Sequence, residues 1–171
     1  MKTTLAVIND MQAQGVIRKY AIGGAVGATF YLEPAATLDV DIFVALPTSG
    51  GGSLVTLSPI YEYLAARGCS IEGEHIMIGD WPVQFLPASD GLESEALEGA
   101  LETQVEGVRT WVMSAEHLSA IALRTGRAKD SARLVQFLES GVVDRKKLES
   151  ILNRHGLFHK WERFQERYLD Q

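Results

Sequence analysis

The most constraining feature of this sequence is a pair of aspartates inside an apolar segment. Asp39 and Asp41 stand in the run Thr37-Leu-Asp-Val-Asp-Ile-Phe-Val44, whose β-branched and aromatic residues are typical of a strand. Successive side chains of a strand point to opposite faces, so residues two positions apart share a face. Two carboxylates on one face are costly to bury unless positive charge binds them. The pattern therefore predicts a strand that carries a site for a cation.

Two glycines stand before this strand. Gly23 and Gly24 separate a short apolar strand from a helix-like run over residues 25–32. Glycine lets a phosphate approach the backbone amides closely, because no Cβ lies in the way. Hard ions such as Mg²⁺ are bound by one or two carboxylates together with substrate phosphates. The glycines with Asp39 and Asp41 thus predict a site for a nucleoside triphosphate (NTP) and Mg²⁺.

The rest of the chain alternates strand-like and helical segments. Strands are expected over residues 20–23, 37–46, 70–79, 81–86 and 104–113. Helices are expected over residues 3–19, 25–32, 54–67, 89–100, 115–125, 128–140, 144–154 and 157–169, with a glycine- and serine-rich loop over 47–53. This order predicts an α/β (α+β) fold, a mixed sheet flanked by helices with a C-terminal helical bundle. We accordingly divide the chain into a core, 1–113, and a helical region, 114–171.

Length and composition restrict the number of domains and the expected cell compartment. A chain of 171 residues fits one domain, alone or with a small appendage, and no apolar run reaches membrane-spanning length. The start lacks the long apolar stretch of a signal peptide, and the single cysteine, Cys69, permits no internal disulfide, so we expect a cytoplasmic protein without membrane partners.

Charge is divided unevenly along the chain. Residues 1–114 hold five lysines and arginines against fourteen aspartates and glutamates, whereas residues 115–171 hold eleven against eight. The division suits a metal–carboxylate centre beside a phosphate-attracting surface, and equally an acidic domain with a solvated helical tail.

A second group of charged residues follows the break between two expected helices. Arg124, Arg127, Lys129 and Asp130 lie around Gly126. One interpretation places Arg127 and Lys129 against phosphates of a nucleotide or nucleic acid, with Asp130 orienting one of them. The other is an interhelical turn in which Asp130 caps a helix or forms a salt bridge.

The glycine pair, the short helix and the Asp-X-Asp strand together resemble the signature of the nucleotidyltransferase superfamily related to DNA polymerase beta. The similarity is to small bacterial members of this superfamily, the minimal nucleotidyltransferases and the AbiEii-like toxins. The stretches Pro82-Val-Gln-Phe-Leu-Pro87 and Ala120-Ile-Ala-Leu-Arg-Thr-Gly-Arg-Ala-Lys-Asp130 resemble a less characterised branch of that superfamily. The resemblance implies a nucleotidyltransferase-type fold and transfer of a nucleoside monophosphate from an NTP to a hydroxyl.

The resemblance also assigns roles and exposes departures. It makes Asp39 and Asp41 Mg²⁺ ligands, and Gly23 and Gly24 part of the triphosphate site. The serine that usually follows the glycines is Ala25 here, the third carboxylate corresponds to Gln84, and a lysine of AbiEii-like members corresponds to Ala122. Glutamine can hydrogen-bond but is a poor general base. Carboxylates that could substitute for it are Asp80, Glu72 and Glu74.

Three functions stay open on these grounds. The first is an enzyme that transfers a nucleoside monophosphate to RNA, protein or a small molecule. The second is a catalytically degenerate member that binds nucleotide or nucleic acid, or serves in a toxin–antitoxin pair. The third is an interaction module that works through the helical tail, where Trp161, Phe164 and Tyr168 recur at helical spacing.

The histidines offer no strong metal motif. His75 and His117 are isolated, so we expect core or surface roles for both. His155 and His159 are four residues apart, which would permit a zinc pair on one helix, but Gly156 between them favours a helix break.

Overall fold

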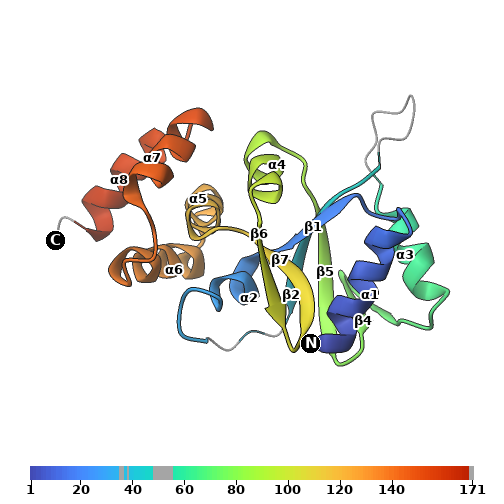
Figure 1. Ribbon diagram of the computed structural model, residues 1–171. Coiled ribbons are helices and arrows are strands. Elements are labelled where there is room, and N and C mark those ends of the chain that lie inside the picture. The colour runs from blue at the N-terminus through green and yellow to red at the C-terminus, as the bar shows by residue number, and fades with distance from the viewer. Residues whose placement is uncertain (35–36, 38, 48–55, 170–171) are drawn as a thin grey trace.

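The computed structural model describes residues 1–34, 37, 39–47 and 56–169. In this part of the chain seven strands form one mixed sheet in the order β3-β4-β5-β2-β1-β7-β6 (Figure 1). The strands are β1 (Lys19–Ile22), β2 (Val40–Ala45), β3 (Ile71–Glu72), β4 (His75–Ile78), β5 (Trp81–Pro87), β6 (Leu101–Val105) and β7 (Val108–Val112). Strand β2 pairs antiparallel with β1 and parallel with β5, and β1 pairs parallel with β7. The mixed α/β class expected from the sequence is confirmed.

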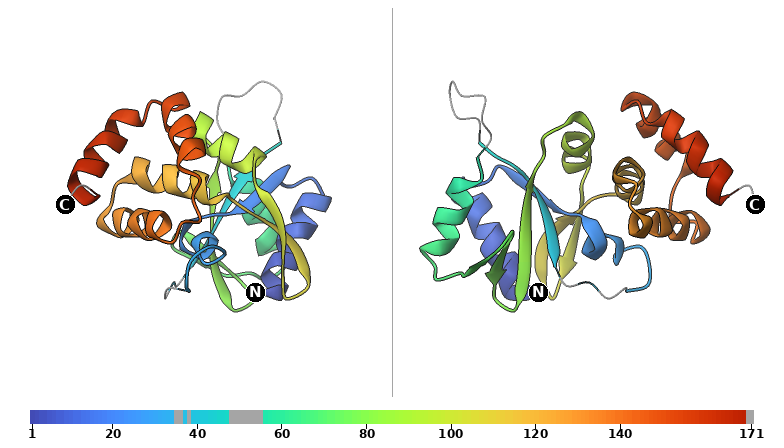
Figure 2. Two further views of the ribbon diagram at one scale, coloured as in Figure 1. Left: turned by 60° about the vertical axis from the view of Figure 1, so that its left-hand side comes forward. Right: turned by 180° about the vertical axis from the view of Figure 1, so that it is seen from behind.

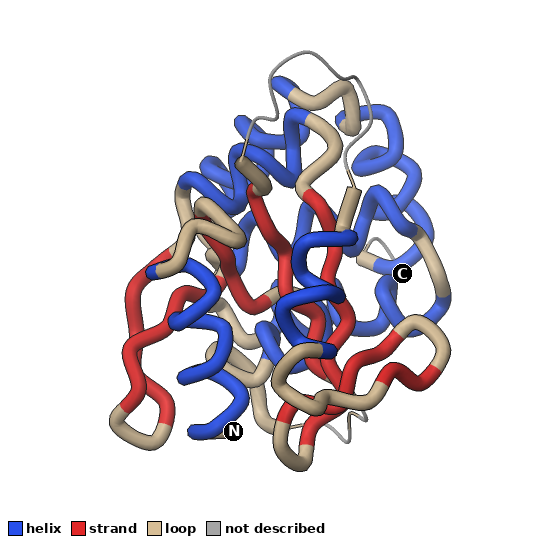
Figure 3. Tube along the Cα trace, turned by 90° about the vertical axis from the view of Figure 1, so that its right-hand side faces the viewer, coloured by secondary structure: helices blue, strands red, loops and turns tan. Residues whose placement is uncertain are grey.

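Two helices cover one face of the sheet. These are α1 (Lys2–Ala13) and α3 (Ser58–Ala65), whose buried side chains include Leu5 and Ile60. They form one apolar cluster with Val40, Ile42 and Val44, the alternate residues of β2. Figure 3 looks onto this side, where α1, starting at the N marker, lies across the strands. Because side chains alternate along β2, its remaining residues are left for the opposite face.

The remaining helices gather on the opposite face. They are α2 (Gly24–Ala28), α4 (Gly91–Glu98), α5 (Ala115–Thr125), α6 (Ala128–Glu139), α7 (Arg145–Arg154) and α8 (Phe158–Tyr168). Both views of Figure 2 show α5–α8 beside the sheet, away from α1 and α3. A second apolar cluster joins Ala21 and Phe43 of the sheet to Phe137 and Trp161 of these helices. The helical region and the sheet thus share one core, and their division at residue 113 stays a prediction.

The C-terminal helices follow the sequence prediction closely because their ends carry strong local signals. The Ser114 hydroxyl caps α5 by accepting from the His117 backbone N–H. Gly126 ends α5 in a left-handed conformation, φ 70°, which glycine adopts without strain. Helix α6 begins two residues later, so this turn sets where its first charged residues point.

Four expected elements differ from the structure. The helix predicted over 3–19 ends at Ala13, and Lys19 already belongs to β1. The strand predicted over 70–79 is broken by a turn at Gly73 into β3 and β4, and the strand predicted over 104–113 folds back as the β6–β7 hairpin. In that hairpin Glu106 and Gly107 both have positive φ, which gives a tight turn that reverses the chain. The helix predicted over 25–32 ends at Ala28. The predicted loop over 47–53 lies outside the described residues except for Pro47.

No helix in the described ranges combines the length and the apolar character needed to cross a membrane.

Candidate functional site

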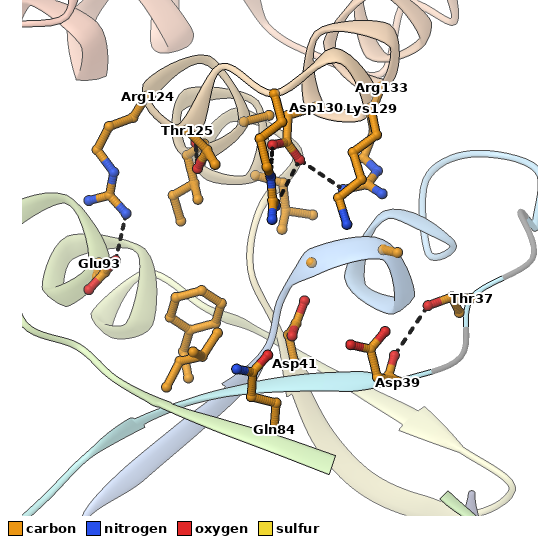
Figure 4. Close-up of a pocket in the computed structure, with 18 of the residues that line it drawn as sticks. Thr37, Asp39, Asp41, Gln84, Glu93, Arg124, Thr125, Lys129, Asp130 and Arg133 are labelled. Carbon is orange, nitrogen blue, oxygen red and sulfur yellow. Dashed lines mark hydrogen bonds and ion pairs between the residues drawn. The ribbon is translucent and has the colours of Figure 1, made fainter. Parts of the chain in front are cut away.

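A cavity of about 810 Å³ opens between the free face of the sheet and helices α5 and α6 (Figure 4). Its size is typical of a small-molecule site. It brings together most of the site residues predicted from the sequence, namely Gly24, Asp39, Asp41, Gln84, Arg127, Lys129 and Asp130. Gly23 is not among the described lining residues. Residues as distant in the sequence as Gly24 and Asp130 therefore meet in one place.

Asp41 lies at the centre of the sheet side. In the parallel pairing of β2 with β5 it stands directly beside Gln84, the position matched to the family's third carboxylate. Its neighbours Ile42 and Val40 are fully buried on the other face, so its own side chain is directed toward the cavity. Figure 4 shows the Asp41 and Gln84 side chains close together on this wall.

The glycine pair is required by the close approach of α2 to β2. A Cβ on Gly24 would lie 1.8 Å from Asp41 Oδ2, and the φ of Gly24 is +56°. A Cβ on Gly23 would lie 2.5 Å from the Phe43 ring, and the Gly23 N–H donates to the Asp41 carbonyl oxygen at 2.9 Å. Gly24 thus makes room for the carboxylate of Asp41, and Gly23 makes room for the Phe43 ring.

The carboxylate of Asp41 is influenced by charges across the cavity but has no hydrogen-bond donor among the described residues. Burial raises the pKa of its carboxyl group, and the neighbouring Asp39 raises it further, while Lys129, Arg133 and Arg127 oppose the shift from across the cavity. In the described part of the chain no donor hydrogen-bonds its carboxylate. A half-buried carboxylate beside a second one, without donors, favours binding of a cation.

Asp39 stands just before β2 and has a partner that sequence reasoning missed. His75 Nε2 lies 3.2 Å from Asp39 Oδ2, and the Thr37 hydroxyl donates to the Asp39 carbonyl oxygen at 3.2 Å. We expected a core or surface role for His75. No local signal links it to Asp39, because their contact depends on the register of three strands.

Gln84 contacts one of the three carboxylates named as substitutes. Its Nε2 donates to Glu74 Oε2 at 3.3 Å. Glu74, Glu72 and Asp80 are not among the described residues that line the cavity. A different carboxylate, Glu93, does line it, but Arg124 Nη2 lies 2.5 Å from Glu93 Oε1.

The opposite wall of the cavity is positive. Asp130 is buried and accepts from Arg127 Nε at 2.6 Å, and Arg133 Nη1 lies 3.8 Å from its other oxygen. Lys129 is exposed and also lines the cavity (Figure 4). Arg133 was missed from the sequence, although its position one helical turn after Lys129 could have indicated it. This contact is the salt bridge of the second interpretation, and a role for Asp130 in orienting Arg127 against phosphates stays a prediction.

Arg124 also lines the cavity, but its charge is directed to α4. It pairs with Asp90 and Glu93 at the start of α4, so its charge is compensated there. The position matched to a family lysine, Ala122, lines the cavity. The chain therefore has three cations, Arg127, Lys129 and Arg133, facing Asp41 from one side.

The histidine pair near the C-terminus does not form a zinc site. Helix α7 ends at Arg154, and α8 begins at Phe158, so the expected break at Gly156 is confirmed. His155 Nε2 lies 2.6 Å from Glu95 Oε2, and His159 Nδ1 lies 3.6 Å from Glu162 Oε2. Among the residues that the structure describes, no three His, Cys, Asp or Glu side chains are placed to hold a metal ion.

Comparison with known proteins identifies the fold but no close relative. No family model and no curated protein matches the sequence. The solution structure of the antibiotic-resistance factor ANT(2'')-Ia matches with a TM-score of 0.55 at 16% identity, over 98% of this chain and 99% of that one. The crystal structure of ANT(2'')-Ia in complex with adenylyl-2''-tobramycin matches equally, over 98% and 95%.

A third similar structure is an antigenic nucleotidyltransferase-like protein from Paracoccidioides brasiliensis. It matches with a TM-score of 0.52 at 11% identity, over 81% of this chain and 73% of that one. These likenesses show that the chain has the nucleotidyltransferase-type fold expected from the sequence. The narrower assignment to an AbiEii-like branch stays a prediction.

Proposed function

We propose that this protein transfers a nucleoside monophosphate from an NTP to a hydroxyl of an acceptor, with release of pyrophosphate. One observation carries the proposal: two carboxylates on the β2 side, Asp39 and Asp41, face three cations of α6 across a single cavity. An NTP bound with a divalent ion carries both signs of charge. The ion would be attracted to the two carboxylates, and the phosphates would be attracted to the three cations. The nucleotidyltransferase-type fold supports this assignment.

The residues present fit a Mg²⁺ ion. Asp39 and Asp41 supply hard oxygen donors, and a cation between them would relieve the repulsion that raises the pKa of Asp41. Two carboxylates do not complete an octahedral shell, so phosphate oxygens and water would supply the other ligands. When bound, the ion would stabilise charge on the attacked phosphate and on the leaving pyrophosphate.

The other residues would bind and orient the substrate. Arg127, Lys129 and Arg133 would neutralise the phosphates that leave as pyrophosphate. Asp130 accepts from Arg127 Nε and lies near Arg133 Nη1, and it would keep both guanidinium groups directed at the cavity. The glycine at position 24 keeps the entrance between α2 and Asp41 free of a side chain.

The presence of glutamine at position 84, in place of a carboxylate, favours a second candidate function. A carboxylate there would accept the proton of the attacking hydroxyl, whereas a carboxamide cannot accept it. The alternative is a catalytically degenerate protein that binds nucleotide or nucleic acid, or a toxin–antitoxin component. RNA, protein and small molecules all remain acceptor classes to test, and the adenylyl-2''-tobramycin bound to ANT(2'')-Ia favours including hydroxyl-bearing small molecules.

Calorimetry of NTP binding tests the site. All four NTPs are tested with Mg²⁺ present. Any NTP that binds the native protein should bind Asp39→Ala/Asp41→Ala at least about tenfold more weakly. That factor corresponds to a loss of about 1.4 kcal/mol of binding free energy, which the cation would supply. Asp10→Ala/Glu62→Ala removes two exposed carboxylates on α1 and α3, outside the cavity, and should bind like the native protein. Equal binding by both double variants would contradict the proposal.

A second experiment separates catalysis from binding. Labelled NTPs are incubated with RNA, lysate proteins or hydroxyl-bearing small molecules, using the native protein and Gln84→Glu. A general base contributes about 10²–10⁴-fold, so Gln84→Glu should increase transfer if its carboxylate reaches the acceptor. Transfer by the native protein establishes an enzyme. Transfer by Gln84→Glu alone favours the degenerate alternative.

A further inference from the structure

We infer that two adjacent residues outside the cavity, Glu74 and His75, orient the oxygen-bearing side chains of Gln84 and Asp39. The inference rests on the proposed function, because Asp39 is a proposed metal ligand and Gln84 stands at the third-carboxylate position. Neither Glu74 nor His75 touches the proposed substrate, so both are positioning residues.

The sheet register explains how one short segment reaches both targets. Ile76 of β4 pairs with Val83 of β5, which pairs with Val40 of β2, and all three side chains are buried on the α1 side. Because side chains alternate, the next residue on each strand faces the cavity side. That row contains His75, Gln84 and Asp41, and Asp39 shares it two residues before Asp41.

The turn between β3 and β4 places the segment at this row. Gly73 has φ +65° and reverses the chain directly before Glu74, so Glu74 and His75 follow from the same turn. Glu74 Oε2 accepts from Gln84 Nε2 at 3.3 Å, and His75 Nε2 contacts Asp39 Oδ2 at 3.2 Å. Two consecutive residues therefore hold two different residues of the site.

Each contact has a chemical consequence for the cavity. The contact with His75 engages one oxygen of Asp39 and leaves Oδ1 for a cation. The contact with Glu74 engages the NH₂ group of Gln84, so its amide oxygen is the end directed away from Glu74. A reversed amide would bring N–H donors toward the cation site and weaken it. Partners outside the ligand set commonly tune metal affinity in this way.

The two contacts are too exposed to be important for folding. The His75 and Asp39 side chains are 32% and 40% exposed, and pairs of this kind contribute only about 0–1 kcal/mol. Their removal should therefore leave the fold intact. An effect on ligand binding without an effect on stability is what distinguishes positioning from a structural role.

Binding of Mn²⁺ to the full chain, followed by electron paramagnetic resonance, tests the inference. We expect His75→Ala to weaken Mn²⁺ about tenfold and Glu74→Ala about threefold, with unchanged thermal stability. His75→Gln keeps a donor and Glu74→Gln keeps an acceptor, so both should bind Mn²⁺ within about twofold of the native protein. His159→Ala and Glu62→Ala, at exposed positions outside the row, are the matched controls. Glutamine variants that lose as much affinity as the alanine variants would overturn the inference.

A measurement without metal separates this inference from the proposed function. In nuclear magnetic resonance spectra we expect Glu74→Ala to shift the side-chain amide signals of Gln84, and His75→Ala to shift the carboxyl carbon of Asp39. Unchanged signals in both variants would overturn the positioning role. Absence of Mn²⁺ and NTP binding in the native protein, with these shifts present, would instead contradict the proposed function alone.

Discussion

Two acidic side chains on neighbouring elements have opposite environments. Glu95 of α4 accepts from Arg154 Nη2 at 2.5 Å and lies 2.6 Å from His155 Nε2 and 3.2 Å from His117 Nε2. The hydrogen bonds from Arg154, supported by those from the histidines, lower the pKa of Glu95 to about 2. Asp41 of β2 has a raised pKa through burial and through Asp39. The two carboxyl groups therefore differ in the direction of their pKa shifts, down for Glu95 and up for Asp41.

Around Glu95, the rings of His155 and His117 pack closely against the glycines at the two ends of α4. A Cβ on Gly91 would lie 3.5 Å from the His155 ring, and one on Gly99 would lie 3.4 Å from the His117 ring. Gly91, Glu95 and Gly99 form a stripe on one side of α4, against which α5 and α7 dock. A carboxylate supplied with donors from both helices stabilises the structure, whereas a carboxylate without donors, such as Asp41, is suited to a ligand.

The largest effect is expected at Gly24, because the absence of a side chain there leaves room for the Asp41 carboxylate. We expect Gly24→Ala to lower the free energy of unfolding by about 3 kcal/mol, since a left-handed alanine costs about 1 kcal/mol and the overlap with Asp41 adds about 2. Gly15→Ala is the control: its φ is +74° but nothing lies within 4 Å of the added Cβ, so it should lose only about 1 kcal/mol. Urea denaturation measures both. Equal losses would show that Gly24 is not packed against Asp41.

Glu95 tests the other side of the comparison. Glu95→Gln should destabilise the protein by about 2 kcal/mol, because charge-assisted hydrogen bonds to three partners are weakened. Glu98→Gln, on the same helix, removes only an exposed pair with Lys19 and should lose less than about 1 kcal/mol.

Acid titration sharpens this prediction. Because the folded pKa of Glu95 is depressed to about 2, its contribution is complete above its ordinary value of 4.5 and disappears as the pH falls toward 2. The difference in stability between the native protein and Glu95→Gln should therefore shrink over that range. A difference independent of pH would exclude the ionic contribution.

Asp41 should behave in the opposite sense. Without metal at neutral pH, Asp41→Asn should stabilise the protein by about 1 kcal/mol, a typical size for relief at a functional site. A raised folded pKa means that the charge is unfavourable in the folded state above that pKa, so the advantage of Asn should vanish as the pH falls through it. Asp80→Asn, at an exposed turn, should change nothing. Thermal melts without Mg²⁺ measure both, and a destabilised Asp41→Asn would contradict the electrostatic account.

Much of the site could be predicted from neighbouring residues. The Gly-Gly pair, the Asp-X-Asp strand and the start of α6 at residue 128 follow local patterns of spacing, propensity and capping. Gln84 was indicated only by the resemblance to the nucleotidyltransferase superfamily. Alternation along one strand is enough to place Asp41 opposite Ile42. The capping signals at Ser114 and Gly126 are likewise contained in a few consecutive residues, and the structure confirms the helix between them.

Strand register and helix docking decided the rest. His75 meets Asp39 only because β4, β5 and β2 pair in one register, and a slip by one residue would turn His75 to the other face. Arg124 and Arg127 are three residues apart, yet Arg124 turns to Glu93 on α4 while Arg127 turns to Asp130. The sequence by itself determined which chemical groups are available and in which local conformation they stand. Their partners depended on contacts between distant segments, whose free energies no local pattern contains.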